Sequence, residues 1–209
     1  MTRLEYNGKE YSIPQNWDEL TLGDYCRCFN GLDLSGVTEE EDEVEKSSRS
    51  ESEREVAKFK RLRTMEGVVL SRLLGEDDGF CLDMPLSIYA FLNESVSFMY
   101  DVNQFMENRH ASIEINGNLW TVPPLQEMPL RSYIDADVTM REEGSYVELL
   151  RCILARKDGD KWIPFDGTTE DIEGLPCSKA LGFVYHFFLL GYSSRKISQA
   201  YSALEQMSL

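Results

Sequence analysis

Few side chains in this sequence have the types and spacing that catalysis or metal binding requires. The chain contains two histidines, and His186 lies in a run of aromatic and aliphatic residues, where a histidine usually has a structural role. His110 precedes a predicted strand and is expected in a loop. Cys26 and Cys28 are two residues apart, so on a helix their thiols point in different directions and cannot share a zinc ion.

The closest approach to a metal site is the acidic turn at residues 76–79 (EDDG). It resembles the start of a calcium-binding loop but lacks the later bidentate glutamate, so we interpret it as a turn. Trp17, Trp120 and Trp162 lie beside turns without a basic groove, which favours core positions over base-stacking platforms. The sequence also contains no phosphate-binding loop and no nucleophile elbow. We therefore expect a protein that is not an enzyme, with no catalytic, cofactor-binding or metal-binding residues.

An internal repeat indicates the elements that hold the other residues in place. Residues 4–14 read LEYNGKEYSIP, and residues 113–123 read IEINGNLWTVP. Both segments alternate apolar and polar residues around Asn-Gly, which is the strongest short signal of a β-hairpin. The match resumes at residues 19–25 (ELTLGDY) and 127–133 (EMPLRSY). A repeat of this kind predicts two copies of one structural unit.

The repeated residues are expected to form scaffold rather than a reactive site. A helix should begin soon after each hairpin, with Thr21 as N-cap in the first copy and Pro129 in the corresponding place in the second. In each copy a leucine and a tyrosine three positions later share one helix face. We expect both tyrosines to be buried and to lock the helix to the hairpin. The predicted scaffold signature is Asn7, Gly8, Trp17, Leu22 and Tyr25, with Asn116, Gly117, Trp120, Leu130 and Tyr133.

The predicted fold class is α+β and mainly α-helical, with two tandem divergent copies of a module made of a β-hairpin and helices. The first module spans residues 1–110 and carries an acidic flexible insertion at about 34–55, and the second spans residues 111–209. Apolar spacing and turn signals predict the individual elements. These are hairpins at 3–13 and 112–122, a short strand at 162–165, and helices at 22–31, 52–74, 86–107, 145–156, 177–192 and 194–206.

The charge balance restricts the possible partners. The net charge is −16, and residues 38–55 alone hold nine acidic and three basic side chains. A general nucleic-acid binder needs a basic footprint, and an anionic membrane surface would repel this chain. We therefore expect neither partner, and no cofactor. Five cysteines without a secretory signal indicate reduced thiols in the cytoplasm.

Residues 7–14 (NGKEYSIP) followed by residues 17–25 (WDELTLGDY) resemble the opening of a class of small bacteriophage proteins, the tail assembly chaperones and related tail or baseplate assembly factors. Residues 69–75 (VLSRLLG) followed by 83–87 (DMPLS) are similar to a second typical element of that class. The resemblance covers about the first hundred residues. It implies a non-enzymatic assembly role in the host cytoplasm, in which the chain holds a tail component such as the tape measure protein.

Two other functions agree with the same features. The chain departs from the simplest pattern of the class by carrying two copies of the motif, which leaves open a structural virion protein of the neck, tail or baseplate. Its acidity leaves open an inhibitor of a host defence protein. That third function would require carboxylates in ordered double rows, whereas the densest acidic run lies at residues 38–55, in the predicted flexible insertion.

Overall fold

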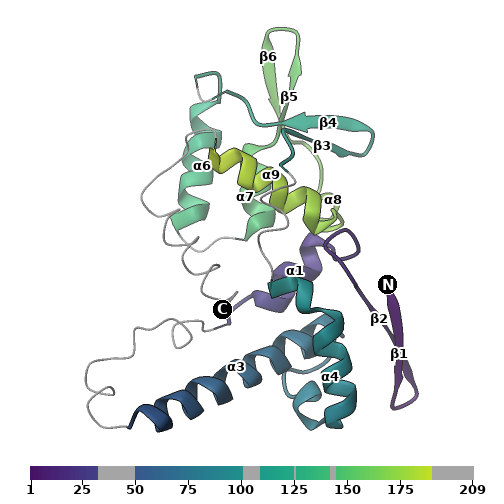
Figure 1. Cartoon of the computed structure of the whole chain (residues 1–209). Coiled ribbons are helices and arrows are strands. Elements are labelled where there is room, and N and C mark those ends of the chain that lie inside the picture. The colour runs from purple at the N-terminus through teal and green to yellow at the C-terminus, as the bar shows by residue number, and fades with distance from the viewer. Residues whose placement is uncertain (33–49, 101–108, 125, 142–144, 190–209) are drawn as a thin grey trace. The chain divides into compact units, whose positions relative to one another are not determined.

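The computed structural model describes residues 1–32, 50–100, 109–124, 126–141 and 145–189, and it shows a mainly helical α+β fold (Figure 1). Within these residues, seven α-helices accompany two small antiparallel sheets of two and four strands. The predicted α+β, mainly α-helical class is thereby confirmed. The chain divides into two compact units.

The first unit begins with a two-stranded hairpin. Strand β1 (Thr2–Tyr6) pairs antiparallel with β2 (Lys9–Ile13), and Tyr6 lies opposite Lys9, so the connecting turn contains two residues. These residues, Asn7 and Gly8, have φ values of 54° and 76°. A type I′ turn requires a positive φ at both positions, and the Asn-Gly pair supplies it. The first predicted hairpin is confirmed.

Aromatic and charged side chains attach this hairpin to the turn after helix α3 (Glu51–Leu73). The ring centroid of Phe80 lies 6.0 Å from that of Tyr6 and 6.1 Å from that of Tyr11. The Tyr11 hydroxyl donates to Glu76 Oε1 over 2.9 Å, and the Lys9 ammonium pairs with the same oxygen. The acidic turn at 76–79 therefore anchors the hairpin.

Helix α3 begins earlier than the predicted insertion allows. Ser50 is its N-cap and forms a capping box with Glu53, so residues 51–55 belong to the helix rather than to a loop. The Ser/Glu-rich composition that suggested a loop also supplies the S-x-x-E pattern of a helix start. The remainder of the predicted insertion, up to residue 49, lies outside the described residues.

Two shorter elements pack against the C-terminal part of α3. The 3-10 helix η1 (Phe80–Asp83) and helix α4 (Leu86–Ser95) follow it, and the Tyr89 hydroxyl donates to Glu66 Oε2 over 3.2 Å. Burial, with Glu66 nearby, raises the pKa of Tyr89 to about 12. The helix predicted at 86–107 ends at Ser95. The chain then makes a 3-10 turn, η2 (Ser97–Tyr100), which buries Met99.

The second unit contains the four-stranded sheet. Its strand order is β3-β4-β5-β6, and all neighbours are antiparallel. Asn116 and Gly117 repeat the positive φ values of the first hairpin, at 53° and 73°, so the second predicted hairpin is also confirmed. Gly159, with φ 59°, opens the two-residue turn between β5 and β6, as in a type II′ turn. The strands are β3 (Ser112–Ile115), β4 (Asn118–Thr121), β5 (Ala155–Asp158) and β6 (Lys161–Pro164).

Four helices complete the described part of this unit. The helix predicted at 145–156 ends at Ile153, because Leu154 is extended and Ala155 pairs with Thr121 and Pro164 as part of β5. Phe183 and Phe187 are the largest side chains that are fully buried among the described residues. The helix predicted at 194–206 lies outside the described residues. The four helices are α6 (Leu130–Arg141), α7 (Tyr146–Ile153), α8 (Thr169–Glu173) and α9 (Cys177–Leu189).

Residues 16–26 also belong to the second unit, although residues 1–15 and 27–32 belong to the first. Backbone hydrogen bonds attach this segment to the start of α9: Leu22 N donates to Leu175 O, and Cys177 N donates to Leu20 O, each over 2.8 Å. Helix α1 (Leu22–Phe29) begins here, with Thr21 as the predicted N-cap that accepts from Asp24 N. The compact units therefore do not coincide with modules 1–110 and 111–209. The tandem duplication stays a prediction.

Candidate interaction site

The first copy of the predicted scaffold signature is buried where a scaffold role requires it. Leu22 is fully buried, and Trp17 and Tyr25 are nearly so. The Tyr25 ring lies 5.8 Å from Trp17 and 6.3 Å from Tyr146 on α7, measured between ring centroids. We expected this tyrosine to lock its helix to the hairpin. Its ring packs against Trp17 and against Tyr146 of α7, so it links α1 to the helical core of the second unit, and the predicted lock to the hairpin stays a prediction.

The second copy differs from the first just after its hairpin. Trp120 is buried and Asn116 Nδ2 donates to Asp171 Oδ1 over 2.8 Å, so the hairpin is scaffold. Leu130, however, is 72% exposed and Tyr133 is 42% exposed, so the expectation that Tyr133 is buried is wrong. The sequence signature is the same in both copies, but its surroundings are not.

Leu130 and Tyr133 are part of a longer apolar face on α6. Ile134 and Val138 are also exposed, and the four residues stand at i, i+3, i+4 and i+8, which places them along one side of a helix. We call Leu130, Tyr133, Ile134 and Val138 the α6 stripe. Scattered surface apolar residues are ordinary, but a contiguous row on one helix face is typical of an interaction surface.

The opposite side of α6 explains why the stripe faces outward. Ala136 is buried, and α6 packs on α7, where Thr139 is hydrogen bonded to Cys152. Small and polar residues of α6 form this contact, and the larger apolar side chains lie on the exposed face of the helix. An ion pair between Arg131 and Asp135, with Nε and Oδ2 3.7 Å apart, lies beside the stripe and is largely exposed.

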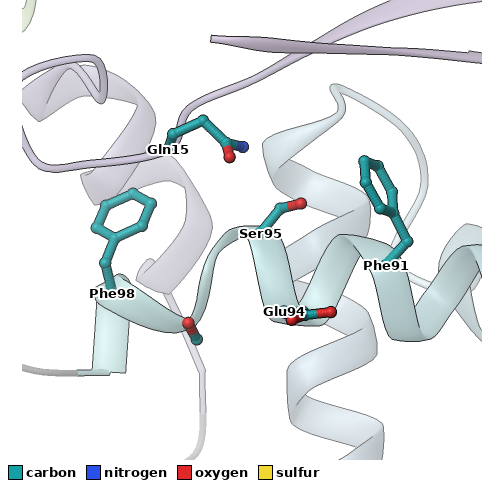
Figure 2. A pocket seen from close by; sticks show the side chains of 6 residues that line it. Gln15, Phe91, Glu94, Ser95 and Phe98 are labelled. Atoms are coloured by element: carbon teal, nitrogen blue, oxygen red, sulfur yellow. The ribbon is translucent and has the colours of Figure 1, made fainter.

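A different kind of surface feature, a hollow, lies in the first unit along α4 and η2. It encloses about 430 Å³ and is lined by Gln15, Phe91, Glu94, Ser95, Ser97 and Phe98. Figure 2 shows the rings of Phe91 and Phe98 on either side of Ser95, with Gln15 facing them. Phe91 is 40% exposed, so the hollow is a surface feature. It could receive one apolar side chain of a partner, and Glu94 favours a basic neighbour to that side chain.

Comparison of the chain with known protein families, curated proteins and solved structures finds no match. The chemical properties of the described residues are therefore inferred from their geometry in this structure. Among these residues, no group of three or more histidine, cysteine or acidic side chains could hold a metal ion. None of the helices in the described ranges combines the length and apolarity needed to cross a bilayer.

The thiols are in surroundings that reduce their reactivity. Burial raises the pKa of Cys26, Cys81 and Cys152 above the ordinary thiol value. Thiols with raised pKa values stay protonated near neutral pH, and the protonated form is a poor nucleophile and a poor metal ligand. Cys177, which is buried, donates its thiol to Thr21 O over 3.2 Å and so serves the packing of the first segment.

The three tryptophans were predicted as core residues. Trp17 and Trp120 are buried, which confirms the prediction for these two. Trp162 is only half-buried, and its indole N–H donates to Glu127 Oε2 over 2.8 Å at the surface of the β5–β6 hairpin. The sequence repeat placed Leu130 and Tyr133 on one helix face but did not include Ile134 and Val138, whose spacing is the signal that completes the α6 stripe. The exposure of the stripe depends on contacts far away in the chain.

Proposed function

We propose that this chain is a non-enzymatic bacteriophage assembly protein, a tail assembly chaperone or related factor. It holds an apolar helical segment of a tail component, such as the tape measure protein, until that component is assembled. The α6 stripe is the observation that carries this proposal. The biological setting is supported by the resemblance of residues 7–14 and 17–25 of the chain to the tail assembly class.

The stripe has the form that a helical partner segment would need. An amphipathic helix laid along α6 would bury Leu130, Ile134 and Val138 in the manner of helix-in-groove recognition. The net charge of −16 favours a partner segment with lysine or arginine beside its apolar residues, because opposite charges speed the encounter and exclude acidic competitors. The first copy of the repeat supports a protein partner for the stripe. Leu22 and Tyr25, which are equivalent to Leu130 and Tyr133, are buried within the protein.

Co-expression with the tape measure protein of the same phage tests the proposal. The tape measure protein should be soluble with the natural chain and should sediment as aggregate without it. The double variant Leu130→Ser, Ile134→Ser should lose this effect, while Leu119→Ser, which alters an exposed leucine on β4, should keep it. Circular dichroism of each variant checks that the fold is retained.

Two results would contradict the proposal. One is a tape measure protein that stays insoluble with the natural chain, and the other is full solubility with the double variant. Recovery of the chain in finished, purified particles would instead indicate the virion role, since a chaperone leaves before the tail is complete.

A further inference from the structure

The N-terminal half of α3 is a helical arm without buried residues. Every buried residue of α3 lies between Gly67 and Ser71, whereas residues 51–64 are exposed or half-buried. We call residues 51–64 the α3 arm. At about 1.5 Å per residue it is about 21 Å long. An isolated helix of this length is marginal in water, so the arm depends on its cap at Ser50 and on the rest of α3.

One face of the arm is arranged for contact. Val56, Phe59, Lys60 and Arg63 stand at i, i+3, i+4 and i+7, so they lie on one side of the helix. Val56 is 52% exposed and Phe59 is 58% exposed. The Arg63 guanidinium lies over the Phe59 ring, 5.2 Å from its centroid, and pairs with Glu66 at 2.7 Å. These contacts hold the aromatic ring and the guanidinium in place before any partner arrives.

This face continues one that is already used for packing. Gly67 and Leu70 follow Arg63 by four and seven residues, so they extend the same side of α3, and both are buried. Leu82 of η1 lies so close to Gly67 that an added Cβ there would be 2.3 Å from Leu82 Cδ2. The helix thus packs through this face in its C-terminal half and leaves the face open along the arm, as expected of a helix with a second packing partner.

Residues 58–63 of the arm have a local charge opposite to that of the chain, whereas Glu51, Glu53 and Glu55 lie at the start of the arm. Lys58, Lys60, Arg61 and Arg63 lie within six residues that contain no acidic side chain, in a chain of net charge −16. Screening limits their attraction to about 8 Å at physiological salt, so a ligand must come close to the arm to benefit. A long polyanion or an anionic membrane would also meet the acidic remainder of the chain. A short acidic helix can contact residues 56–63 without the acidic start of the arm.

We propose that the α3 arm binds an acidic amphipathic helix of a partner protein. The apolar side chains of that helix contact Val56 and Phe59, and its carboxylates pair with Lys60 and Arg63. This surface is separate from the α6 stripe, so the inference goes beyond the proposed function and does not depend on it.

Fluorescence anisotropy at about 0.15 M salt tests this proposal with the full chain. The probe is a labelled synthetic peptide of about 18 residues, five helical turns, with leucine along one face and glutamate on the others. The comparison probes are its twin with lysine in place of glutamate, a single-stranded DNA oligonucleotide, and vesicles that contain phosphatidylserine. We expect the acidic peptide to bind at least about tenfold more tightly than each of the others.

Matched charge reversals distinguish a specific face from general attraction. The variant Lys60→Glu, Arg63→Glu alters the proposed face, and Lys58→Glu, Arg61→Glu makes the same charge change on the other side of the arm. The first should weaken binding of the acidic peptide by about tenfold or more, and the second by less than about threefold. Phe59→Ser leaves the charge unchanged and should also weaken binding by about tenfold.

The proposal fails if the acidic peptide does not bind below about 100 μM. It also fails if both reversals weaken binding equally, if Phe59→Ser binds normally, or if DNA or vesicles bind as tightly as the peptide. Circular dichroism confirms that each variant retains its helices.

Discussion

Tyr25 and Tyr133 occupy equivalent positions in the sequence repeat but have different surroundings. Tyr25 contacts Trp17 and Tyr146 in the core, whereas Tyr133 lies on the exposed face of α6. Residue type alone therefore does not decide whether a side chain stabilises the fold or meets a partner. The contribution of each tyrosine follows from how much of its surface the folded chain covers.

Tyr25→Ala should lower the free energy of unfolding by about 3–5 kcal/mol, because it removes a buried aromatic ring and leaves a cavity. Tyr133→Ala should lower it by only about 1 kcal/mol, since nearly half of that side chain is already in water. Urea denaturation of both variants measures the difference. Equal losses would show that Tyr133 is packed more firmly than its exposure indicates.

The two Asn-Gly turns show why particular glycines are needed. Gly8 has φ 76° with open space around it, and Gly79 has φ −86°, also with open space. Only the backbone conformation distinguishes the two sites, so they form a matched pair for measuring its cost.

Gly8→Ala should destabilise the protein by about 1–2 kcal/mol, because this is the free-energy cost of placing an L-residue in the left-handed region. Gly79→Ala should stabilise it by about 0.4–1 kcal/mol through the lost entropy of the unfolded chain. Chemical denaturation with both variants provides the test. A neutral Gly8→Ala would mean that the turn relaxes to another form.

At the scale of elements, the sequence predicts starts better than ends. Local side chains determine the starts: Thr21 caps α1, and Ser50 with Glu53 caps α3. Distant contacts determine several ends. The helix beginning at Leu86 stops at Ser95, before a 3-10 turn that buries Met99, and the helix predicted to reach residue 156 stops where Ala155 joins the sheet.

The same distinction applies to the candidate site. The spacing of Leu130, Ile134 and Val138 is visible in the sequence and predicts one apolar helix face. Whether that face is covered depends on the tertiary structure, which spacing does not encode. Leu22 is buried where its backbone bonds to Leu175, far along the chain, whereas Leu130 is 72% exposed, and no local pattern predicts this difference.

At the scale of the whole molecule, paired carboxylates make stability depend on pH. The hydrogen bonds from Lys9 and Tyr11 lower the pKa of Glu76 below its ordinary value of 4.5. Hydrogen bonds from Arg72 and Asn116 lower the pKa of Asp78 and Asp171 in the same direction. A carboxyl with a lowered folded-state pKa stabilises the fold at neutral pH, and this contribution is lost as acid protonates it.

Glu76→Gln should therefore lower the thermal midpoint at pH 7. The difference from the natural chain should shrink as the pH falls below 4.5 and should vanish once Glu76 is protonated in the folded state. Thermal melts from pH 7 to pH 3 measure it. Glu5→Gln, an exposed position in the same hairpin, is the control and should show no such trend. A difference independent of pH would mean that Glu76 acts only through neutral hydrogen bonds.

The attachment of residues 16–26 to the start of α9 has a consequence for synthesis on the ribosome. Leu22 N bonds to Leu175 O, so the segment's partner emerges 153 residues later. At about 5–20 residues per second, Trp17, Leu20 and Leu22 remain without this partner for roughly eight to thirty seconds. A nascent chain that stalls before Leu175 cannot bury them. During this interval the nascent chain itself needs protection from aggregation, which is the function proposed for the folded protein toward its partner.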